Sequence, residues 1–459
     1  MNAFSALNLS EALVKGLATI DYHDMTPIQA AALPLVLAGH DVIAQAQTGS
    51  GKTAAFALGL LQMLDVGTVQ LQGLVLCPTR ELADQVSKEI RRLARPLPNV
   101  KVLTLCGGVS LRPHLASLAH EPHLVVGTPG RILELLRKQA LSLKSLQMLV
   151  LDEADRMLDM GFSADIEAIL KAAPKQRQTL MFSATFPDSA RAIAERHLRD
   201  PETITIANGD TGPDIEQRVY EVADGSRKLD ALVDLLVTER PASAIVFCNT
   251  RADTRDVAES LDRCGFSVLA LHGDLDQRER DEMLVRFANH SCTILVATDV
   301  AARGLDIKEL PLVVNYDVAS DADAHVHRIG RTGRAGARGL ALTLATPRDA
   351  GRLLVISERP GQSLQRTALP RVGGKPRPLL SSHLTIAVDG GRADKLRPGD
   401  LLGALTGDTG LPGDAVGKID IFPTRSYVAI QRSHADAALH RLRDGKIKGR
   451  SFRVRRIGH

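Results

Sequence analysis

Short apolar runs that alternate with helical stretches constrain the fold of this chain more than any other feature. They come in two series of four, at 74–76, 102–105, 124–126 and 180–182, and at 244–247, 268–271, 293–296 and 312–314. Strands that alternate with helices in this way form βαβ units, in which a parallel sheet is buried on both faces. The sequence therefore predicts an α/β fold with two parallel-sheet domains, the second repeating the architecture of the first.

Breaks in this pattern divide the chain. A charged, poorly periodic stretch near 207–214 separates the two series, and four prolines with a Gly-Gly pair between 360 and 378 are typical of an extended linker. At 459 residues the chain is also too long for a single core. We therefore expect a first α/β domain at 1–206, a second at 215–359, a linker at 360–382 and a small terminal domain at 383–459.

The terminal domain shows a different order of elements. Strands are expected at 384–388, 418–422, 427–430 and 451–455, with helices around 401–405 and at 436–443. This βαββαβ order matches the RNA-recognition-motif fold, a small α+β domain. The aromatic rings on which such sheets stack bases are nearly absent, because Tyr427 and Phe422 are the only candidates and Ile430 stands where a second ring would lie.

Positive charge is concentrated in the terminal domain. Residues 383–459 hold 14 Lys and Arg against 8 Asp, a net charge of +6, so the rest of the chain carries −2 of the total of +4. Clustered cations attract polyanions through counterion release, and we therefore expect this domain to bind nucleic acid. The alternative is a solubilising basic tail, which the alternating apolar pattern of the segment disfavours.

Other features limit the class of protein. No apolar stretch of about eighteen residues is available to span a membrane, and the N-terminus lacks the segments of a secretory signal. The cysteines at 77, 106, 248, 264 and 292 have no close pair, which argues against disulfides or a zinc site and indicates buried small apolar residues. We expect a cytoplasmic protein without membrane partners.

A glycine-rich segment predicts a phosphate-binding loop. Residues 46–53 read Ala-Gln-Thr-Gly-Ser-Gly-Lys-Thr, between a strand expected at 41–45 and a helix expected at 54–58. In such units backbone N–H groups surround phosphate oxygens, the lysine adds charge and the final hydroxyl binds magnesium. A glycine-rich turn without phosphate is the alternative. The residues expected to hold the nucleotide are Thr48, Gly49, Ser50, Gly51, Lys52 and Thr53.

A pair of acids a hundred residues further on completes this site. The apolar run at 148–151 ends in Asp152 and Glu153. A carboxylate at the end of a buried parallel strand can hold Mg²⁺ through water, and its neighbour can orient or deprotonate an attacking water. Adjacent acids alone more often begin a solvated helix, but the upstream loop makes these two a coupled pair. The chain is therefore expected to hydrolyse a nucleoside triphosphate, with Asp152 on the metal and Glu153 on the water.

Further short segments follow in a fixed order. Those of the first half are Thr-Pro-Ile-Gln at 26–29, Pro-Thr-Arg-Glu-Leu-Ala at 78–83, Gly-Gly at 107–108, Thr-Pro-Gly-Arg at 128–131 and Ser-Ala-Thr at 183–185. Those of the second half are Val-Phe-Cys-Asn-Thr at 246–250, Gln-Arg-Glu-Arg at 277–280, Ala-Thr-Asp at 297–299, Arg-Gly-Leu-Asp at 303–306 and His-Arg-Ile-Gly-Arg-Thr-Gly-Arg at 327–334. On these segments the chain resembles the DEAD-box RNA helicases. The resemblance implies two RecA-like domains that close on ATP and single-stranded RNA and separate RNA strands locally.

The same resemblance implies roles around ATP. Gln29 would pair with the adenine edge and Phe4 would stack on the base, which favours ATP over GTP. Arg331 and Arg334 would reach the γ-phosphate as arginine fingers, which contribute roughly 10³–10⁵ in rate. Asp306 would contact the ribose. With Lys52, Asp152 and Glu153, the two arginines would make up the catalytic set.

The resemblance to the DEAD-box helicases also implies contacts with RNA phosphates that do not depend on the RNA sequence. His327 would couple ATP to RNA through 183–185. The residues expected to contact RNA in the two large domains are Arg80, Gly108, Thr128, Arg131, Thr250, Gly273 and Thr298.

Two segments of the terminal domain, 417–422 and 446–450, resemble the bacterial DbpA subgroup of this family. In that subgroup the domain binds a 23S ribosomal RNA hairpin of the peptidyl-transferase region on precursors of the 50S subunit, and the protein is a monomer. A helicase of broader RNA specificity, in mRNA decay or cold adaptation, is the alternative; a clamp without turnover would need a damaged ATP site. Chosen for charge and placement, the expected terminal contacts are Lys418, Arg425, Lys446, Lys448, Arg450, Arg453 and Arg455.

Overall fold

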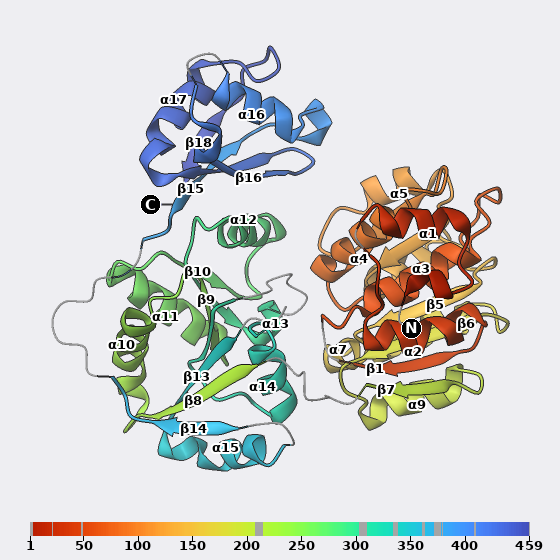
Figure 1. Ribbon diagram of the computed structural model, residues 1–459, viewed down its shortest axis with the longest axis horizontal. Coiled ribbons are helices and arrows are strands. Elements are labelled where there is room, and N and C mark those ends of the chain that lie inside the picture. Colours follow the sequence, from red (N-terminus) through yellow and green to blue (C-terminus); the bar gives the residue numbers. More distant parts are fainter. Residues whose placement is uncertain are drawn as a thin grey trace. The chain divides into compact units, whose positions relative to one another are not determined.

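The described residues form two compact units, one within residues 1–212 and one within residues 213–459. The computed structural model (Figure 1) describes residues 3–20, 22–46, 49–206, 214–302, 310–333, 338–359, 363–370, 378, 380–407 and 410–458. Thr48, Asp306 and Arg334 lie outside the described residues.

The first unit contains a parallel sheet with strand order β3-β4-β2-β5-β6-β1-β7. Its strands are β1 (Val42–Gln45), β2 (Gly73–Leu76), β3 (Val102–Leu105), β4 (Leu124–Gly127), β5 (Met148–Asp152), β6 (Gln178–Ser183) and β7 (Glu202–Thr205). Its helices are α1 (Glu11–Ala18), α2 (Pro27–Leu37), α3 (Lys52–Met63), α4 (Arg80–Leu93), α5 (Arg112–Leu118), α6 (Pro129–Arg137), α7 (Ala154–Asp159), α8 (Ser163–Ala172) and α9 (Asp188–His197).

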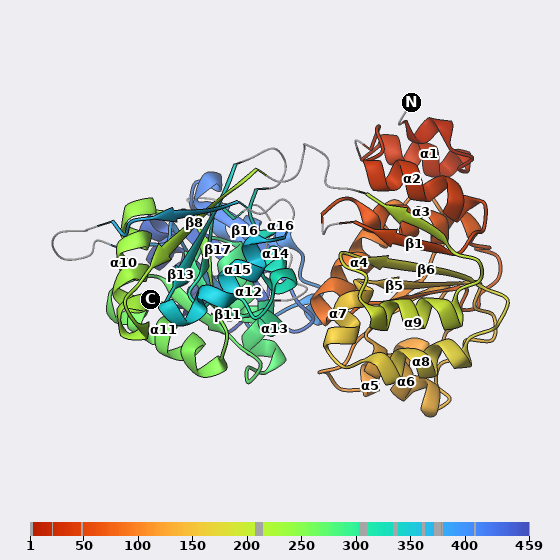
Figure 2. The ribbon, with the colours of Figure 1, turned by 90° about the horizontal axis from the view of Figure 1, so that it is seen from below.

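Helices cover both faces of this sheet. Figure 2 shows α2 and α3 on one side of β1, β6 and β5, and α8 and α9 on the other. Successive strand residues point to opposite faces. Val42 and Ala44 accordingly join one apolar cluster, with α2, α3 and α4, while Ile43 joins the other, with α6, α8 and α9. Burial on both faces explains why these strands read as continuous apolar runs.

The second unit begins with a parallel sheet of order β10-β11-β9-β12-β13-β8-β14. Its strands are β8 (Ile215–Glu221), β9 (Ala244–Cys248), β10 (Val268–Leu271), β11 (Ile294–Thr298), β12 (Leu312–Asn315), β13 (Gly339–Ala345) and β14 (Leu364–Thr367). Its helices are α10 (Lys228–Glu239), α11 (Arg251–Arg263), α12 (Gln277–Ala288), α13 (Asp299–Ala302), α14 (Ala322–Ile329) and α15 (Ala350–Ser357).

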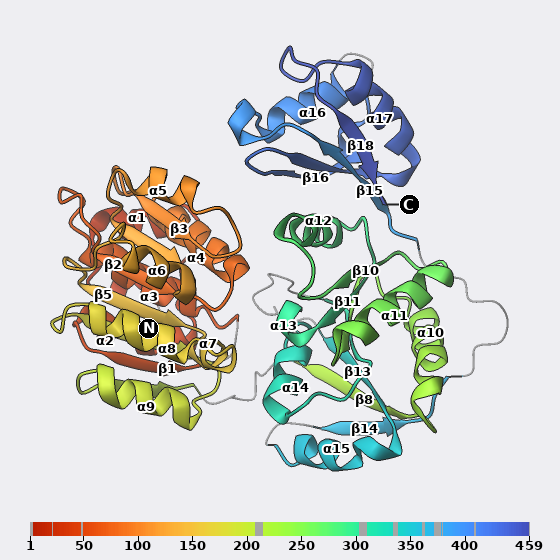
Figure 3. The same ribbon diagram turned by 180° about the vertical axis from the view of Figure 1, so that it is seen from behind.

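The same unit ends in a small antiparallel domain of order β16-β17-β15-β18. Its elements are β15 (His383–Val388), α16 (Pro398–Thr406), β16 (Val416–Ile421), β17 (Ser426–Gln431), α17 (Ala435–Asp444) and β18 (Val454–Ile457). Both helices lie on one side of the sheet (Figure 3), where Ile386, Val428 and Leu442 pack together. The expected fold class, two RecA-like parallel-sheet domains and a small α+β domain, is confirmed.

The opposite face of the small sheet packs against α12. Ala387, Tyr427 and Ile457 form an apolar cluster with Val285, and Tyr427 is 2% exposed. At the edge of this cluster the Asn289 side chain donates a buried hydrogen bond of 3.0 Å to the Thr385 hydroxyl. The face that RNA-recognition motifs offer to bases is therefore occupied here by contacts within the chain.

The structure corrects several sequence expectations. The predicted linker 360–382 contains β14, which pairs with β8 as a short polar edge strand. The last strand is Val454–Ile457 rather than 451–455. Strands β7, β8 and β13 were missed, the first two because they mix polar and apolar residues. Cys264 is exposed, whereas the other four cysteines are buried as expected.

None of the helices in the described residues combines the length and the apolar character of a membrane span.

Candidate active site and nucleic-acid interface

The strand order of the first sheet brings three loops together. Because β6 lies between β5 and β1, their carboxyl ends meet at one edge, with Asp152 beside Phe182 and Gln45 beside Ser183. The loop after β1 is the expected phosphate loop, and the loop after β5 carries the acid pair. Ligands of open α/β sheets bind outside the carboxyl ends of the strands, where such loops meet.

The phosphate loop leads directly into α3. Gly49 and Gly51 have φ of 87° and 96°, backbone conformations that glycine adopts without steric cost. Gly51 caps the helix and Lys52 is its first residue, so free N–H groups point into the loop. Ser50 and Thr53 are partly exposed beside them. The described part of the loop therefore has the geometry of an anion-binding helix start.

Lys52 is buried at this point. Its ammonium donates to the Ala46 carbonyl at 2.7 Å, and the residue is 6% exposed. Burial lowers the pKa of the amine, and the carboxylates of Asp152, Glu153 and Asp155 oppose that shift. The positive charge of Lys52 thus lies close to the carboxylates of Asp152, Glu153 and Asp155.

Asp152 shows the opposite effect. Burial, followed by the charge of Glu153, raises the pKa of the Asp152 carboxyl to about 7, against the attraction of Lys52. A buried carboxylate with too little positive charge around it fits a divalent cation, and Thr53, one residue after Lys52, has a hydroxyl of the kind that can bind one. The donor set therefore suits Mg²⁺.

Asp155 ties the acid pair to the end of β6. Its Oδ2 accepts hydrogen bonds from the backbone N–H of Ala184 (3.2 Å) and Thr185 (2.8 Å) and from the Thr185 hydroxyl (2.9 Å). Its own N–H donates to the Ser183 hydroxyl at 3.2 Å. The sequence predicted no such role for Asp155, although the Ser-Ala-Thr segment that it holds was found.

Glu153 occupies a strained position between these groups. Its φ of 54° is left-handed, which costs a non-glycine residue about 1–2 kcal/mol. Its carboxylate forms an ion pair of 2.7 Å with Arg156, a residue that sequence reasoning missed.

The two residues expected to bind adenine are both buried. The Gln29 side chain accepts from the Thr26 N–H at 2.9 Å and donates to the Gly51 carbonyl at 3.1 Å. Gln29 is therefore bonded to the phosphate loop directly before Lys52. Phe4 is 2% exposed, with its ring centroid 6.0 Å from that of Tyr22. Stacking on a base would require Phe4 to expose part of its ring.

The expected RNA contacts of the first unit follow β3 and β4 and begin α4. The Thr128 hydroxyl accepts from the Gly107 N–H at 3.1 Å, next to the exposed Gly108. Arg80, the first residue of α4, has a buried Nη1 without a hydrogen-bond partner in the described structure.

Arg131 is more constrained than the sequence suggested. Its guanidinium contacts the Val109 carbonyl at 2.6 Å and the His114 ring at 2.6 Å, and Glu134 lies 3.1 Å away. Burial and the Arg131 charge lower the pKa of His114, which suits a neutral ring that accepts from Arg131. A phosphate would have to compete with these contacts.

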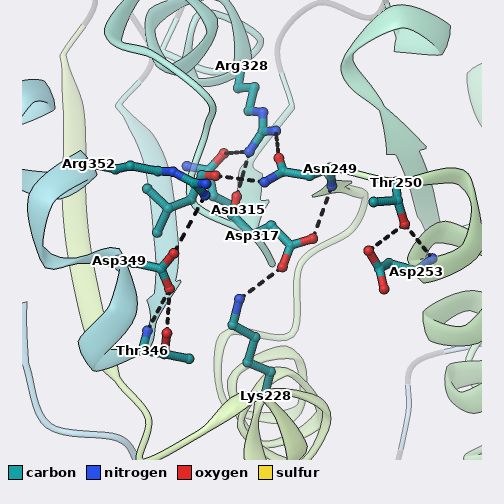
Figure 4. A network of polar contacts seen from close by, with 11 residues as sticks. Lys228, Asn249, Thr250, Asp253, Asn315, Asp317, Arg328, Thr346, Asp349 and Arg352 are labelled. Atoms are coloured by element: carbon teal, nitrogen blue, oxygen red, sulfur yellow. Dashed lines mark hydrogen bonds and ion pairs between the residues drawn. The ribbon is translucent and has the colours of Figure 1, made fainter.

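In the second unit, buried Arg328 joins the ends of three neighbouring strands. It forms a two-fold ion pair with Asp299, after β11, at 2.6 and 2.7 Å. It also donates to Asn249 at 2.7 Å and to the Asp317 carbonyl at 2.6 Å, after β9 and β12, as Figure 4 shows. The Asp317 carboxylate in turn accepts from Lys228 at 2.9 Å. The sequence motif that contains Arg328 indicates no role for it, because only its long-range partners reveal one.

The expected site residues of this unit lie at or just after the ends of β9, β10, β11 and α14. Thr250 caps α11 and Thr298 ends β11, and their hydroxyls accept from the N–H groups of Asp253 and Ala301. Arg331 is 8% exposed at the end of the helix segment that bears Arg328. Gly273 is exposed, with open space where a Cβ would lie.

Comparison with known proteins identifies the class. Residues 26–193 match the DEAD/DEAH box helicase family, 227–336 the helicase conserved C-terminal domain and 385–456 the DbpA RNA binding domain. The chain is 53% identical over 456 residues to the ATP-dependent RNA helicase DbpA of Escherichia coli K12, covering 99% of each chain. The chain belongs to the DbpA subgroup of the DEAD-box ATP-dependent RNA helicases.

More distant relatives agree on the helicase core. The DEAD-box ATP-dependent RNA helicase CshA of Bacillus cereus is 44% identical over 371 residues, which cover 81% of this chain and 70% of that protein. Dbp5 of S. cerevisiae, in a structure bound to RNA and ADP BeF3, is 30% identical with a TM-score of 0.73, covering 80% of this chain and 96% of that one.

The helicase's terminal domain presents part of its charge on one turn. Lys448 and Gly449 have φ of 53° and 77°, and Ile447 and Arg450 exchange backbone hydrogen bonds across them, as in a tight hairpin turn. Lys446 and Arg450 are exposed on either side. Lys448 donates to the Lys395 carbonyl at 2.9 Å and lies 3.6 Å from Asp400.

The other expected terminal contacts are less uniform. Arg453 is exposed, and Lys418 lies 3.5 Å from Asp420. Arg425 lies 3.7 Å from Asp389, and Arg455 forms an ion pair of 3.4 Å with Glu282 on α12.

Asp152 generates a prediction about pH. Its folded pKa, about 7, lies above the ordinary 3.8, so the folded helicase binds the extra proton between these values and loses stability as pH rises through them. We expect Asp152→Asn to unfold at a higher temperature than the parent at pH 8, with a gain that shrinks toward pH 5. Thermal unfolding at both values tests this, with the exposed Asp200→Asn as control. An equal gain at both pH values would contradict the assignment.

Arg328 generates a prediction about stability. Arg328→Met removes the buried donor of the partly exposed Asp299 carboxylate, of Asn249 and of the Asp317 carbonyl, and each hydrogen bond to a charged group contributes about 1.5–3 kcal/mol. Arg352→Met removes a half-exposed arginine whose partner, Asp349, lies 3.8 Å away, and such pairs contribute about 0–1 kcal/mol. We expect a large drop in thermal midpoint for the first variant and little for the second. Equal effects would show that the Arg328 network does not stabilise the second sheet.

Proposed function

We propose that this helicase unwinds RNA locally on 23S ribosomal RNA during assembly of the large ribosomal subunit, as a cytoplasmic monomer. The observation that carries the proposal is the basic turn at 446–450, in a domain that matches the DbpA RNA binding domain and whose sheet face is covered. A turn with flanking cations suits a folded RNA element better than stacked single-stranded bases. A hairpin of the peptidyl-transferase region is the target we expect, on precursors of the 50S subunit.

The proposed chemistry uses the groups at the strand ends. The helix start at Gly49–Thr53 holds the ATP phosphates, Lys52 leaves the Ala46 carbonyl to meet them, and Glu153 orients the attacking water and takes its proton. Mg²⁺, held by Thr53 and Asp152, would neutralise charge on the phosphates. Arg331 and Arg334 stabilise the charge that develops on the γ-phosphoryl group, Gln29 and Phe4 select adenine, and Asp306 contacts the ribose.

RNA phosphates in this proposal are held by the two large domains without sequence readout. The Thr128 hydroxyl, directly after β4, accepts from the Gly107 N–H, and the buried Thr298 hydroxyl, at the end of β11, accepts from the Ala301 N–H. Specificity then belongs to the terminal domain, whose net charge of +6 also contributes to RNA affinity.

A DEAD-box helicase of broader RNA specificity is the competing function. The 44% identity to CshA covers 81% of this chain, which shows that the core is shared beyond one subgroup. The experiment is ATP hydrolysis with a 23S RNA fragment that carries the hairpin, against equal masses of unrelated structured RNA and poly(A). Selective stimulation by the fragment supports the ribosomal target; equal stimulation by every RNA rejects it and leaves the broader helicase.

Glu153 generates a prediction about turnover. Glu153→Gln keeps the size of the side chain but cannot take a proton, and general bases contribute about 10²–10⁴ in rate. We expect RNA-stimulated ATP hydrolysis to fall by that range, while binding of a fluorescent ATP analogue and of RNA changes little. Glu167→Gln, in a partly exposed ion pair on α8, serves as control. Substantial residual turnover would remove Glu153 from the proposed role.

The basic turn generates a prediction about RNA affinity. Lys446→Ala with Arg450→Ala removes two exposed cations and leaves the contacts of Lys448 in place. Binding to the hairpin fragment should weaken. The slope of log affinity against log salt concentration should become less steep, by the amount that corresponds to roughly two fewer phosphate contacts. Arg443→Ala with Arg456→Ala removes the same charge from α17 and β18 and should change both quantities less. Equal effects of the two pairs would indicate general attraction rather than a contact at the turn.

A further inference from the structure

Arg156 lies on the first turn of α7 with its guanidinium against the carboxylate of Glu153. Nη1 donates to Oε2 at 2.7 Å, and the two side chains are 3% and 9% exposed. A buried arginine needs an opposite charge with good geometry, because the penalty for removing the charge from water is several kcal/mol per ion. The pair is therefore built into the site.

The surroundings direct Arg156 to Glu153 and not to the neighbouring acids. Asp155 is the closest alternative, but its Oδ2 accepts three hydrogen bonds from Ala184 and Thr185, and its Oδ1 accepts the Arg156 N–H. The Asp152 carboxylate is attracted by the ammonium of Lys52 instead. Glu153 is the acid left to balance the guanidinium.

We propose that Arg156 is a positioning residue that presents Glu153 to the attacking water. The left-handed backbone at Glu153, with φ of 54°, sets the direction of its side chain, and the ion pair one helical turn later fixes its carboxylate through Oε2. Oε1 has no hydrogen bond or ion pair with any residue that the structure describes. The inference rests on the function proposed for Glu153.

The step that this arrangement serves balances as follows. The water oxygen forms a bond to the γ-phosphorus while the bond from that phosphorus to the β,γ-bridging oxygen breaks, and ADP leaves with the bonding electrons. The water proton passes to Oε1 of Glu153 and is later released with inorganic phosphate. Arg156 touches neither ATP nor water; it keeps the acceptor oxygen in place.

Two other roles for Arg156 predict different kinetics. A cation that binds the ATP phosphates would change KM, since Arg156 is close enough to Lys52 to lower its pKa. A cation that only stabilises the fold would act independently of Glu153. A positioning residue changes kcat and has no effect once Glu153 cannot act as a base.

The experiment compares Arg156→Ala, Arg156→Lys, Glu153→Gln and the double variant Glu153→Gln/Arg156→Ala in the full-length protein. With RNA at saturation we expect Arg156→Ala to lower kcat by about 10–100-fold, because misplacement of a catalytic group by about 1 Å can cost 10²-fold. KM for ATP and the affinity for a fluorescent ADP analogue should stay within about twofold, and Arg156→Lys should recover most of the loss. The double variant should be no slower than Glu153→Gln alone.

Separate outcomes overturn the two levels of the argument. If Glu153→Gln retains full turnover, the proposed function of Glu153 fails. If Glu153→Gln is inactive but Arg156→Ala keeps full kcat, raises KM or adds its loss to that of Glu153→Gln, the positioning role fails. Thermal unfolding of each variant shows whether it is folded. If Arg156→Ala does not fold, Arg156→Lys is used for the test. An Arg156→Lys protein with altered KM and unchanged kcat would also overturn the positioning role.

Discussion

Buried charges at the carboxyl ends of β5, β6 and β1 must balance one another, and the ATP site depends on this balance. Lys52 and Arg156 lie among the carboxylates of Asp152, Glu153 and Asp155, all 7% exposed or less. Burial destabilises every one of these charges, and only the opposite charges nearby make the arrangement tolerable. Burial raises the pKa of Asp152 and lowers the pKa of Lys52, so it disfavours the charged form of both side chains. A strand order other than β5-β6-β1 would separate the groups and leave them unpaired.

The central strands could be predicted because both their faces are buried. A run such as Leu-Val-Leu in β2 has no polar position to obscure it. β7 and β14 lie at sheet edges and read Glu-Thr-Ile-Thr and Leu-Gln-Arg-Thr, and β8 beside β14 alternates in the same way, so no apolar run marks them. β13, Gly339–Ala345, has an apolar pattern like the others and could have been found.

Site residues were predictable where residue type alone implies a chemistry. Glycines before a lysine and a hydroxyl indicate a phosphate site, and two acids after a buried strand indicate a site for a metal ion and water. Arg156 and Arg328 carry no such signature, since an arginine in a motif is equally suited to RNA, phosphate or an ion pair. Arg328 meets Asn249, 79 positions away, only because β9 and β12 are neighbours in the sheet. Partners of this kind depend on the whole fold, and short segments of sequence do not contain them.

The terminal domain uses differently the sheet face on which RNA-recognition motifs stack bases. Its sheet face holds Tyr427 against Val285 and Thr385 against Asn289, so this face serves contacts with the second parallel-sheet domain. The shortage of aromatic residues on the sheet follows from this use, because a packed face needs Ala387 and Ile457 more than exposed rings. Positive charge is displaced to the turn at 446–450 and its surroundings. RNA binding at that turn, as proposed here, would leave the packed face intact, so changes at Lys446 and Arg450 would alter RNA affinity without loss of the contacts that attach the domain to α12.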